Sequence, residues 1–422
     1  MIPSALEEFE RECVAFFEAN APRQAEGAPF VWGEGLEAAV MFGDFGGDAE
    51  DEQRRLAEAK AWRAKRFEAG LGWIGGPPEF GGRGLTQAHE RVYAAVESQF
   101  VVPDQTVYVV GLGMVAPTIL AHGTEVAKGR YLTAMHRGDV IGCQLFSEPS
   151  AGSDLAALAC RAERDGDEWV VNGQKVWTSS AHVADIGEIL CRTDVGRPKH
   201  RGITAFLVDM HAPGVTVRPI KQMNGGTSFN EVFLDNVRIP DDHRLGAVDD
   251  GWSVALTTLS NERASVGVGS TEGAALQGVT DATWLMEMLR HFGVEHDPLL
   301  RQKLARVYIG FRVAALNNRR AMAKVKAGQA PGPELSGSKL ALTENLRAVA
   351  DFVGTVLGPR LAADTGEWGT FAWSRFVTAV PGLRVAGGTD EIQRKIIAEQ
   401  VLGLPREPGA DAKMPFRDMP KG

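Results

Sequence analysis

The chain has 422 residues, 44% of them apolar, and this length is too great for one ordinary hydrophobic core, so we expect two or three domains. Its 45 basic and 54 acidic side chains give a net charge of −9, with no block of Lys or Arg that could follow a phosphate backbone. This balance argues against nucleic acid as a partner.

Neither a targeting segment nor a membrane span is expected. The N-terminal residues lack the basic and apolar regions of a signal peptide, and no run of about 18 apolar residues occurs. We therefore expect a cytoplasmic protein without membrane insertion. The four cysteines lie far apart, with no C-x-x-C pair and no histidine cluster beside them, so we expect reduced packing residues and no metal site: Cys13, Cys143, Cys160 and Cys191.

Residues 1–138 have the period of helices. Apolar residues recur at three- and four-residue spacing in 6–17 and 54–69, a pattern typical of amphipathic helices. Two glycine-rich stretches, 75–78 and 81–84, interrupt it. The first zone is therefore predicted to be an α-helical domain.

One segment of this zone resembles a dinucleotide-binding fingerprint. Gly111-Leu-Gly113-Met-Val-Ala116 fits G-x-G-x-x-A and follows a strand-like run, which would indicate a nicotinamide enzyme. However, Pro117 would interrupt the helix that holds the pyrophosphate, and no strand ending in Asp or Glu follows about twenty residues later. We therefore favour a junction between helices.

Residues 139–245 are predicted to be an antiparallel β-domain. The pair Asn172-Gly173 separates two β-prone runs, which predicts a hairpin turn at this point. Further strands are predicted at 203–208, 215–220 and 231–234, with turns at 213–214 and 224–226.

Residues 246–422 return to a helical pattern. Long amphipathic segments occupy 301–325, 338–357 and 391–402. The expected fold is thus multi-domain α+β, with an N-terminal helical domain (1–138), a middle antiparallel β-domain (139–245) and a C-terminal helical domain (246–422).

Three segments carry the functional signal: Gln144–Asp154, Lys175–Ser180 and Gly387–Arg394. In the first, a turn stiffened by proline and followed by small residues lets backbone N–H groups and hydroxyls approach a ligand. Taken alone, this loop could be an ordinary turn and Trp177 a core residue. In this order and at this spacing, the three segments resemble the flavin-binding signature of the acyl-CoA dehydrogenase family, and the resemblance covers nearly the whole chain.

This resemblance implies an N-terminal α-domain, a middle β-domain and a C-terminal four-helix bundle, assembled as a homotetramer. It also implies FAD between the middle and C-terminal domains. In the family, the residue at Trp177 packs beside the isoalloxazine ring and the hydroxyl at Ser179 lies near N5. The implied cofactor contacts are Phe146, Ser147, Ser153, Trp177, Ser179, Thr389 and Glu391.

The implied reaction is the α,β-dehydrogenation of an acyl-CoA to a trans-2-enoyl-CoA, with electrons passed to an electron-transfer flavoprotein. It requires a carboxylate base and hydrogen-bond donors on the thioester carbonyl. Many members carry the base in front of Gly388-Thr389, where this chain has Gly387, which retains only its N–H. Glu262 resembles the position from which isovaleryl-CoA dehydrogenase supplies its base.

Other interpretations of these residues stay open. Glu262 could instead be an ion-paired helix residue beside Arg263. Asp390 and Glu391 are second candidates for the base, although acids at such positions are more typical of a helix N-terminus. The implied substrate contacts are Ser153, Arg263 and Gly388.

Two departures from the family pattern affect the assembly and the cofactor site. Leu289 stands where the family has an Arg that reaches a neighbouring subunit's FAD, and the loop at 357–360 lacks the usual paired glycines. Two alternatives to the dehydrogenase stay open: a flavin oxidase or monooxygenase of the same fold, or an FAD-carrying, non-catalytic subunit of a heteromer with a paralogue, which Leu289 favours. The acyl group is left open by the sequence.

Overall fold

The computed structural model describes residues 4–24, 49–267, 277–326, 332–333, 335–363, 367, 370–406 and 413–419. Its N-terminal part contains helices α1 (Ala5–Asn20), α2 (Ala49–Glu68), α3 (Gln87–Glu97), α4 (Ala116–His122) and α5 (Glu125–Arg137). Ser4 and Glu7 form a capping box that begins α1. The helices predicted over 6–17 and 54–69 are therefore confirmed.

The fingerprint-like segment forms no part of a nucleotide-binding unit. Residues Thr106–Tyr108 form a 3₁₀ turn where a strand would be needed, and Gly111–Val115 form a π-helical segment that continues into α4. Pro117 lies in the first turn of α4, directly after this π-helical segment. The preferred interpretation as a helix junction is confirmed.

The β-domain is one eight-stranded sheet with the order β6-β7-β3-β2-β4-β5-β8 and with β1 beside β4. Most neighbours are antiparallel, but β1 pairs with β4 in parallel, and β2 meets β4 in parallel register. The expectation of a purely antiparallel sheet was wrong at these two places. The strands are β1 (Gly142–Leu145), β2 (Arg161–Asp165), β3 (Glu168–Ser179), β4 (Ile186–Arg192), β5 (Ile203–Asp209), β6 (Val215–Pro219), β7 (Phe229–Pro240) and β8 (Arg244–Leu245).

The hairpin turn predicted at Asn172-Gly173 was also wrong, because β3 runs straight through these residues. The turn lies earlier, at Gly166, whose φ is +64°. Asn172 and Gly173 instead lie at an irregularity in the pairing of β3 with β7. The side-chain oxygen of Asn172 accepts a hydrogen bond from Asn236 N at 2.9 Å. Pairing of β3 with strands on both sides thus outweighs the local turn preference.

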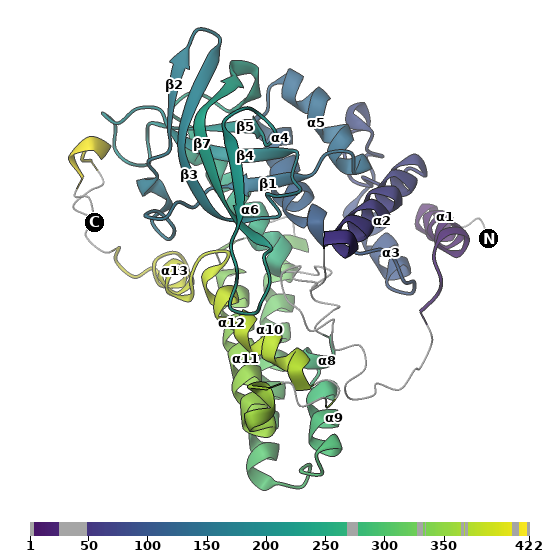
Figure 1. Cartoon of the computed structure of the whole chain (residues 1–422). Coiled ribbons are helices and arrows are strands. Elements are labelled where there is room, and N and C mark those ends of the chain that lie inside the picture. Colours follow the sequence, from purple (N-terminus) through teal and green to yellow (C-terminus); the bar gives the residue numbers. More distant parts are fainter. Residues whose placement is uncertain are drawn as a thin grey trace.

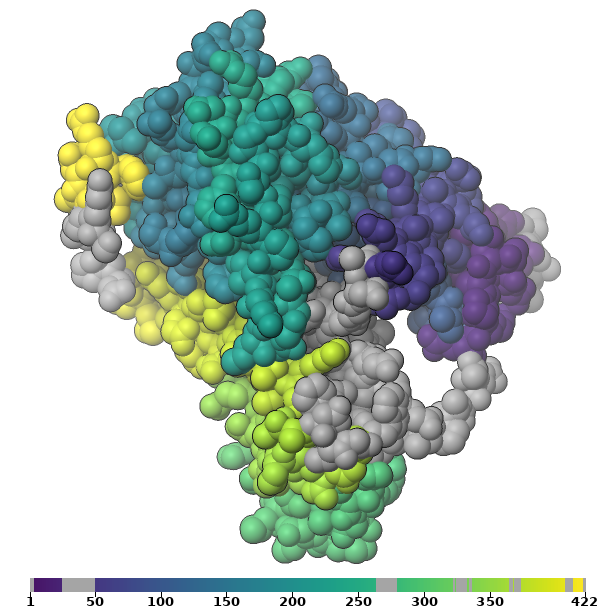
Figure 2. Space-filling view, in the orientation of Figure 1, coloured from purple at the N-terminus to yellow at the C-terminus, as the bar shows by residue number. Residues whose placement is uncertain are grey.

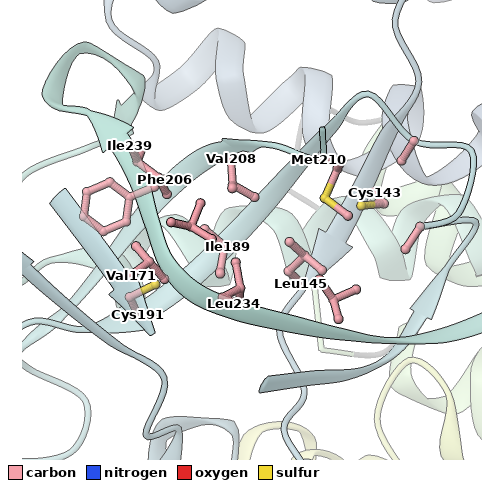
Figure 3. Close-up of a cluster of buried hydrophobic side chains, with 14 of the residues drawn as sticks. Cys143, Leu145, Val171, Ile189, Cys191, Phe206, Val208, Met210, Leu234 and Ile239 are labelled. Carbon is pink, nitrogen blue, oxygen red and sulfur yellow. The ribbon is translucent and has the colours of Figure 1, made fainter. Parts of the chain in front are cut away.

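The two faces of the sheet pack in different layers. Figure 3 shows one face, where Cys143, Leu145, Ile189 and Phe206 gather in one apolar cluster. Side chains alternate along a strand, so the residues between them face the other way. On that second face, an apolar cluster joins the sheet to α4, α5 and α6; its members include Ile186, Leu190, Leu207, Ile119, Leu132 and Val254.

The C-terminal part contains α6 (Gly251–Gly267), α8 (Gln277–Thr280), α9 (Thr283–His291), α10 (Pro298–Lys326), α11 (Leu335–Leu357), α12 (Thr370–Val385) and α13 (Asp390–Ile396). α6 lies between the sheet and the bundle of α9 to α12 (Figure 1). The bundle projects from the larger body that the N-terminal helices and the sheet form (Figure 2). Among the described residues, no helix combines the length and the hydropathy that a membrane span requires.

Leu289 is fully buried in the core of this bundle, together with Phe352, Trp373 and Phe376. The neighbouring Arg290 is exposed and forms an ion pair with Glu287. In this conformation the side chain at position 289 packs inside its own subunit, so it does not reach outward to a cofactor.

Candidate active site

A buried ion pair joins the loop at 147–154 to strand β3. Lys175 Nζ lies 2.8 Å from Glu148 Oε1 and donates a hydrogen bond to the carbonyl oxygen of Phe146 at 3.1 Å. Glu148 also accepts hydrogen bonds from the backbone N–H groups of Ala159 and Cys160. A buried charge is tolerated when its hydrogen bonds are satisfied in this way. The first two functional segments are therefore held together, by two residues that the sequence analysis did not single out.

Trp177 has an unusual backbone and an exposed side chain. Its φ is +61°, that of nearby Ser180 is +56°, and the indole is 58% exposed. A left-handed conformation is uncommon outside glycine, and strain of this kind concentrates at functional sites. The alternative that Trp177 is a core residue is therefore wrong: the strand presents the ring to the outside.

Two polar atoms beside this residue lack partners. Thr178 Oγ1 and Asn230 Oδ1 are buried and make no hydrogen bond within the described structure, although Asn230 Nδ2 donates to the carbonyl oxygen of Thr178 at 3.1 Å. Native proteins rarely leave buried polar atoms unsatisfied. Together with the exposed indole, these atoms fit a polar aromatic ligand at the end of β3.

A second group of predicted residues meets around α6. A Cβ atom built at Gly387 would lie 3.2 Å from Glu262 Oε1, which places the carboxylate of Glu262 beside the α-carbon of Gly387. Gly387 and Gly388 have φ values of +65° and +83°, in the region that favours glycine. Positions 262 and 387 are therefore two alternative places from which a carboxylate can reach the same region.

The loop that contains Gly387 and Gly388 is fixed by side chains from two helices. Lys339 Nζ on α11 donates to the carbonyl oxygen of Gly388 at 2.9 Å, and Gln393 Nε2 on α13 donates to that of Gly387 at 2.9 Å. Burial lowers the pKa of Lys339, while the carboxylates of Asp390 and Glu262 act in the opposite direction. Lys339 is thus within electrostatic reach of Glu262 as well as bonded to the loop.

The acids that follow this loop have separate structural roles. Thr389, not Asp390, caps α13, because its hydroxyl accepts a hydrogen bond from Ile392 N at 3.2 Å. Asp390 is 1% exposed and accepts hydrogen bonds from Arg384 at 2.7 Å and Thr343 at 2.8 Å. Burial alone would raise its pKa, but these hydrogen bonds outweigh burial and lower the pKa. Both oxygens of Asp390 are thereby occupied.

The remaining predicted residues lie in different environments. Glu391 is exposed and lies 3.7 Å from Arg394, Ser153 is exposed in the loop, and Phe146 is buried. Arg263 lies on α6, but its side chain is outside the described part of the structure. The structure thus brings together the segments around Ser147 and Trp177, and separately Glu262 with the loop at 387–389.

Comparison with protein families gives three consecutive matches. The N-terminal, middle and C-terminal domains of acyl-CoA dehydrogenase match residues 47–139, 143–237 and 249–402. Acyl-CoA dehydrogenase IpdE1 of Mycobacterium tuberculosis is 39% identical over 84% of this chain and 90% of its own length. Acyl-CoA dehydrogenase FadE34 of the same organism is 42% identical over 69% of this chain but only 39% of its own length.

Solved structures agree with these matches. The steroid ACAD Tcur3481-Tcur3483 superposes with a TM-score of 0.74 at 28% identity and covers 96% of this chain and 99% of its own. The ChsE4-ChsE5 complex of Mycobacterium tuberculosis gives a TM-score of 0.69 at 28% identity, covering 96% and 100%. The chain therefore belongs to the acyl-CoA dehydrogenase family and is an oxidoreductase that acts on an acyl-CoA.

Proposed function

We propose that this protein uses FAD to dehydrogenate an acyl-CoA to its trans-2-enoyl-CoA, with Glu262 as the general base and an electron-transfer flavoprotein as the acceptor. The observation that carries the proposal is the approach of Glu262 to Gly387. It supplies a carboxylate at the place from which a residue at 387 would otherwise act.

The residues at the end of β3 suit a flavin. The exposed indole of Trp177 offers an aromatic surface, and the unpartnered atoms of Thr178 and Asn230 offer polar contacts. The residues that would hold the cofactor are Phe146, Ser147, Ser153, Trp177, Ser179, Thr389 and Glu391. When bound, the flavin supplies an acceptor for the hydride that leaves the β-carbon.

The protein's own residues position and deprotonate the substrate. Glu262 Oε1 would accept the α-proton, and α6 gives this side chain a rigid support. The hydrogen bonds from Lys339 and Gln393 hold the loop at 387–388, which would keep the Gly387 N–H directed at the thioester oxygen. Ser153, Arg263 and Gly388 remain the proposed contacts of the rest of the substrate.

The chemistry is tested by anaerobic reduction of the bound flavin with a panel of straight-chain, branched and polycyclic acyl-CoAs. We expect bleaching of the flavin absorbance by the best substrate and slow recovery when air is admitted. Rapid recovery in air would instead favour the oxidase or monooxygenase alternative. Because the similar Tcur3481-Tcur3483 protein is described as a steroid ACAD, we expect a polycyclic member of the panel to react fastest.

The cofactor itself is tested by acid release and chromatography of the extracted flavin. We expect FAD. Recovery of FMN or of a nicotinamide would contradict the assignment.

For the assembly we propose a homotetramer, which the exposed apolar face of α10 supports. Tyr308, Ile309, Val313 and Leu316 on this helix are each 44–58% exposed. Apolar patches of this kind are typical of subunit interfaces. Light scattering of the purified chain tests this; a stable monomer would contradict it.

A heteromer with a paralogue is the second candidate. The inward packing of Leu289 and the likeness to the ChsE4-ChsE5 complex favour it. In that case the isolated chain would take up FAD and reach full activity only after the partner is co-expressed.

A further inference from the structure

A carboxylic acid lies in the apolar layer between the sheet and the helices. Glu188, in the middle of β4, is 0% exposed, and its neighbours on the same face of the strand are Ile186 and Leu190. Its Oε1 accepts a hydrogen bond from Thr258 Oγ1 on α6 at 2.6 Å. Its Oε2 is buried and makes no hydrogen bond within the described structure. Such an atom is costly unless something else satisfies it.

A second unpartnered atom lies on the adjacent strand. Gln144 of β1 is the parallel register partner of Glu188. Cys143 and Leu145 point into the cluster of Figure 3, so Gln144 between them faces the same layer as Glu188. Gln144 Nε2 is also buried without a partner among the described residues. Two unused polar atoms therefore stand on neighbouring strands and face the same helices.

The protonation of Glu188 determines what these atoms can bind. Burial raises the pKa of Glu188 to about 8, although the hydrogen bond from Thr258 opposes this. The acid is therefore mostly neutral at pH 7, and a proton on Oε2, the oxygen outside the hydrogen bond to Thr258, would be free to face a ligand. A carboxylic O–H and an amide N–H are both donors, and together they complement an uncharged oxygen acceptor.

This pair lies close to the proposed base. Thr258 and Glu262 are four residues apart on α6, so they share a face and are separated by about 6 Å along the helix axis. Glu262 is partly exposed whereas Thr258 is fully buried. The direction from Glu262 to Thr258 therefore leads into the interior, and an acyl group that follows this direction would reach Glu188.

We propose that Glu188 and Gln144 recognise a hydroxyl or ketone oxygen on the acyl group, about one helical turn inward from the carbon that loses its proton. This inference rests on the proposed function, because it takes Glu262 as the place of proton removal. It makes Glu188 and Gln144 determinants of substrate specificity: they favour an oxygenated acyl group over its deoxy counterpart, which would leave both donors unsatisfied.

Three acyl-CoAs test this: 3-cyclohexylpropanoyl-CoA and its 4-hydroxy and 4-oxo ring derivatives. We expect the wild type to prefer an oxygenated ring, as measured by the ratio of kcat/KM for each derivative to that for the deoxy compound. Glu188→Leu and Gln144→Leu should lower this ratio about tenfold or more. Glu188→Gln should keep it, because an amide can accept from Thr258 and donate with its other atom. Whichever derivative gives the larger ratio identifies the oxygen as hydroxyl or ketone.

An unchanged ratio in both leucine variants would overturn the proposal, and would leave an internal water as the partner of these atoms. If Glu188→Leu does not fold, the comparison of Gln144→Leu with Glu188→Gln decides the outcome, since only the former should lose the preference.

Binding separates this proposal from the proposed function. In a Glu262→Gln background, isothermal titration calorimetry measures the ratio of Kd values for the same compounds without turnover. Tighter binding of an oxygenated compound than of the deoxy compound, if Gln144→Leu abolishes that difference in Kd, supports the oxygen site even if no acyl-CoA is dehydrogenated. Normal dehydrogenation with equal Kd values for the oxygenated and deoxy compounds supports only the proposed function.

Discussion

The carboxylate of Glu262 lies beside the α-carbon of Gly387, because a Cβ atom at position 387 would come within 3.2 Å of Glu262 Oε1. The two residues are far apart in the chain, one on α6 and the other before α13. Under the proposed function, this contact would let the reaction proceed without a side chain at 387, because the glycine leaves room and the helix supplies the carboxylate base.

Replacing Glu262 with Gln should abolish most turnover. The amide keeps the shape and polarity of the side chain but cannot accept the α-proton, so kcat should fall by roughly 10²–10⁴ while FAD content is retained. Stopped-flow measurement of flavin reduction checks this. Glu344→Gln is the matched control, since Glu344 is exposed on α11 and lies outside the proposed site, and near-normal flavin reduction by the Glu262 variant would show that the base lies elsewhere.

Exchanging the two positions should restore little activity. In the double variant Glu262→Gly, Gly387→Glu, a carboxylate returns to the position common in the family, but at a φ of +65° that non-glycine residues adopt with strain. An error of about 1 Å in a reacting group is costly, so we expect activity above that of Glu262→Gly and well below the wild type. Activity equal to the single variant would show that the two positions are not equivalent.

Gly387→Ala should reduce activity more than stability. The new methyl group meets Glu262 Oε1, and the backbone strain costs about 1 kcal/mol of unfolding free energy. Gly293→Ala is the control, because Gly293 has the same φ of +65° with nothing within 4 Å of the added atom. Both variants should lose similar stability in urea, and only the first should lose kcat. Equal activity in the two would argue against contact between Gly387 and the base.

Breaking the buried ion pair should release the cofactor loop. Lys175→Met leaves the Glu148 carboxylate buried without its cation, which should cost about 3–5 kcal/mol and lower FAD occupancy. The exposed pair of Arg238 with Glu168 lies in the same sheet, so Arg238→Met should leave both stability and FAD occupancy nearly unchanged. Chemical denaturation and flavin absorbance measure both effects; retention of FAD by Lys175→Met would disprove the anchoring role.

Trp177→Gly should separate stability from cofactor binding. Glycine relieves the strain at a φ of +61°, and the exposed indole contributes little packing, so the apoprotein should be as stable as the wild type or more so. FAD affinity should nevertheless fall, because the aromatic surface is lost. A large loss of apoprotein stability would show instead that the ring packs within its own fold.

Glu188 should make the protein less stable as pH rises. The pKa of its carboxyl is 4.5 in the unfolded chain and about 8 in the folded one, so between these values the folded state holds a proton that the unfolded state has lost. The free energy of unfolding therefore falls with increasing pH across this window, by up to about 1.4 kcal/mol per pH unit. Glu188→Gln removes this contribution to the pH dependence of the free energy of unfolding. We expect its gain in Tm over the wild type to be larger at pH 8.5 than at pH 5.5, and an equal gain at both would contradict the burial of a neutral acid.

The sequence by itself determined the features that depend on local pattern. The period of apolar residues located α1 and α2, and the three glycine- and hydroxyl-containing segments indicated the family and its flavin site. The absence of a side chain at 387, together with the resemblance of position 262 to the base of isovaleryl-CoA dehydrogenase, indicated Glu262 as the candidate base. These features can be predicted without the tertiary structure because propensity and periodicity are properties of neighbouring residues.

Tertiary structure decided the features that depend on distant partners. Asn172-Gly173 has the local preference of a turn, yet pairing with strands on both sides keeps it inside β3. The acids show the same dependence: Glu148 meets a cation 27 residues away, and Glu188 meets a threonine 70 residues away. A polar side chain can be exposed, paired with an opposite charge, or buried in its neutral form. Which of these occurs depends on the groups that folding places around it, and these groups come from distant parts of the sequence, so the neighbouring residues do not predict it.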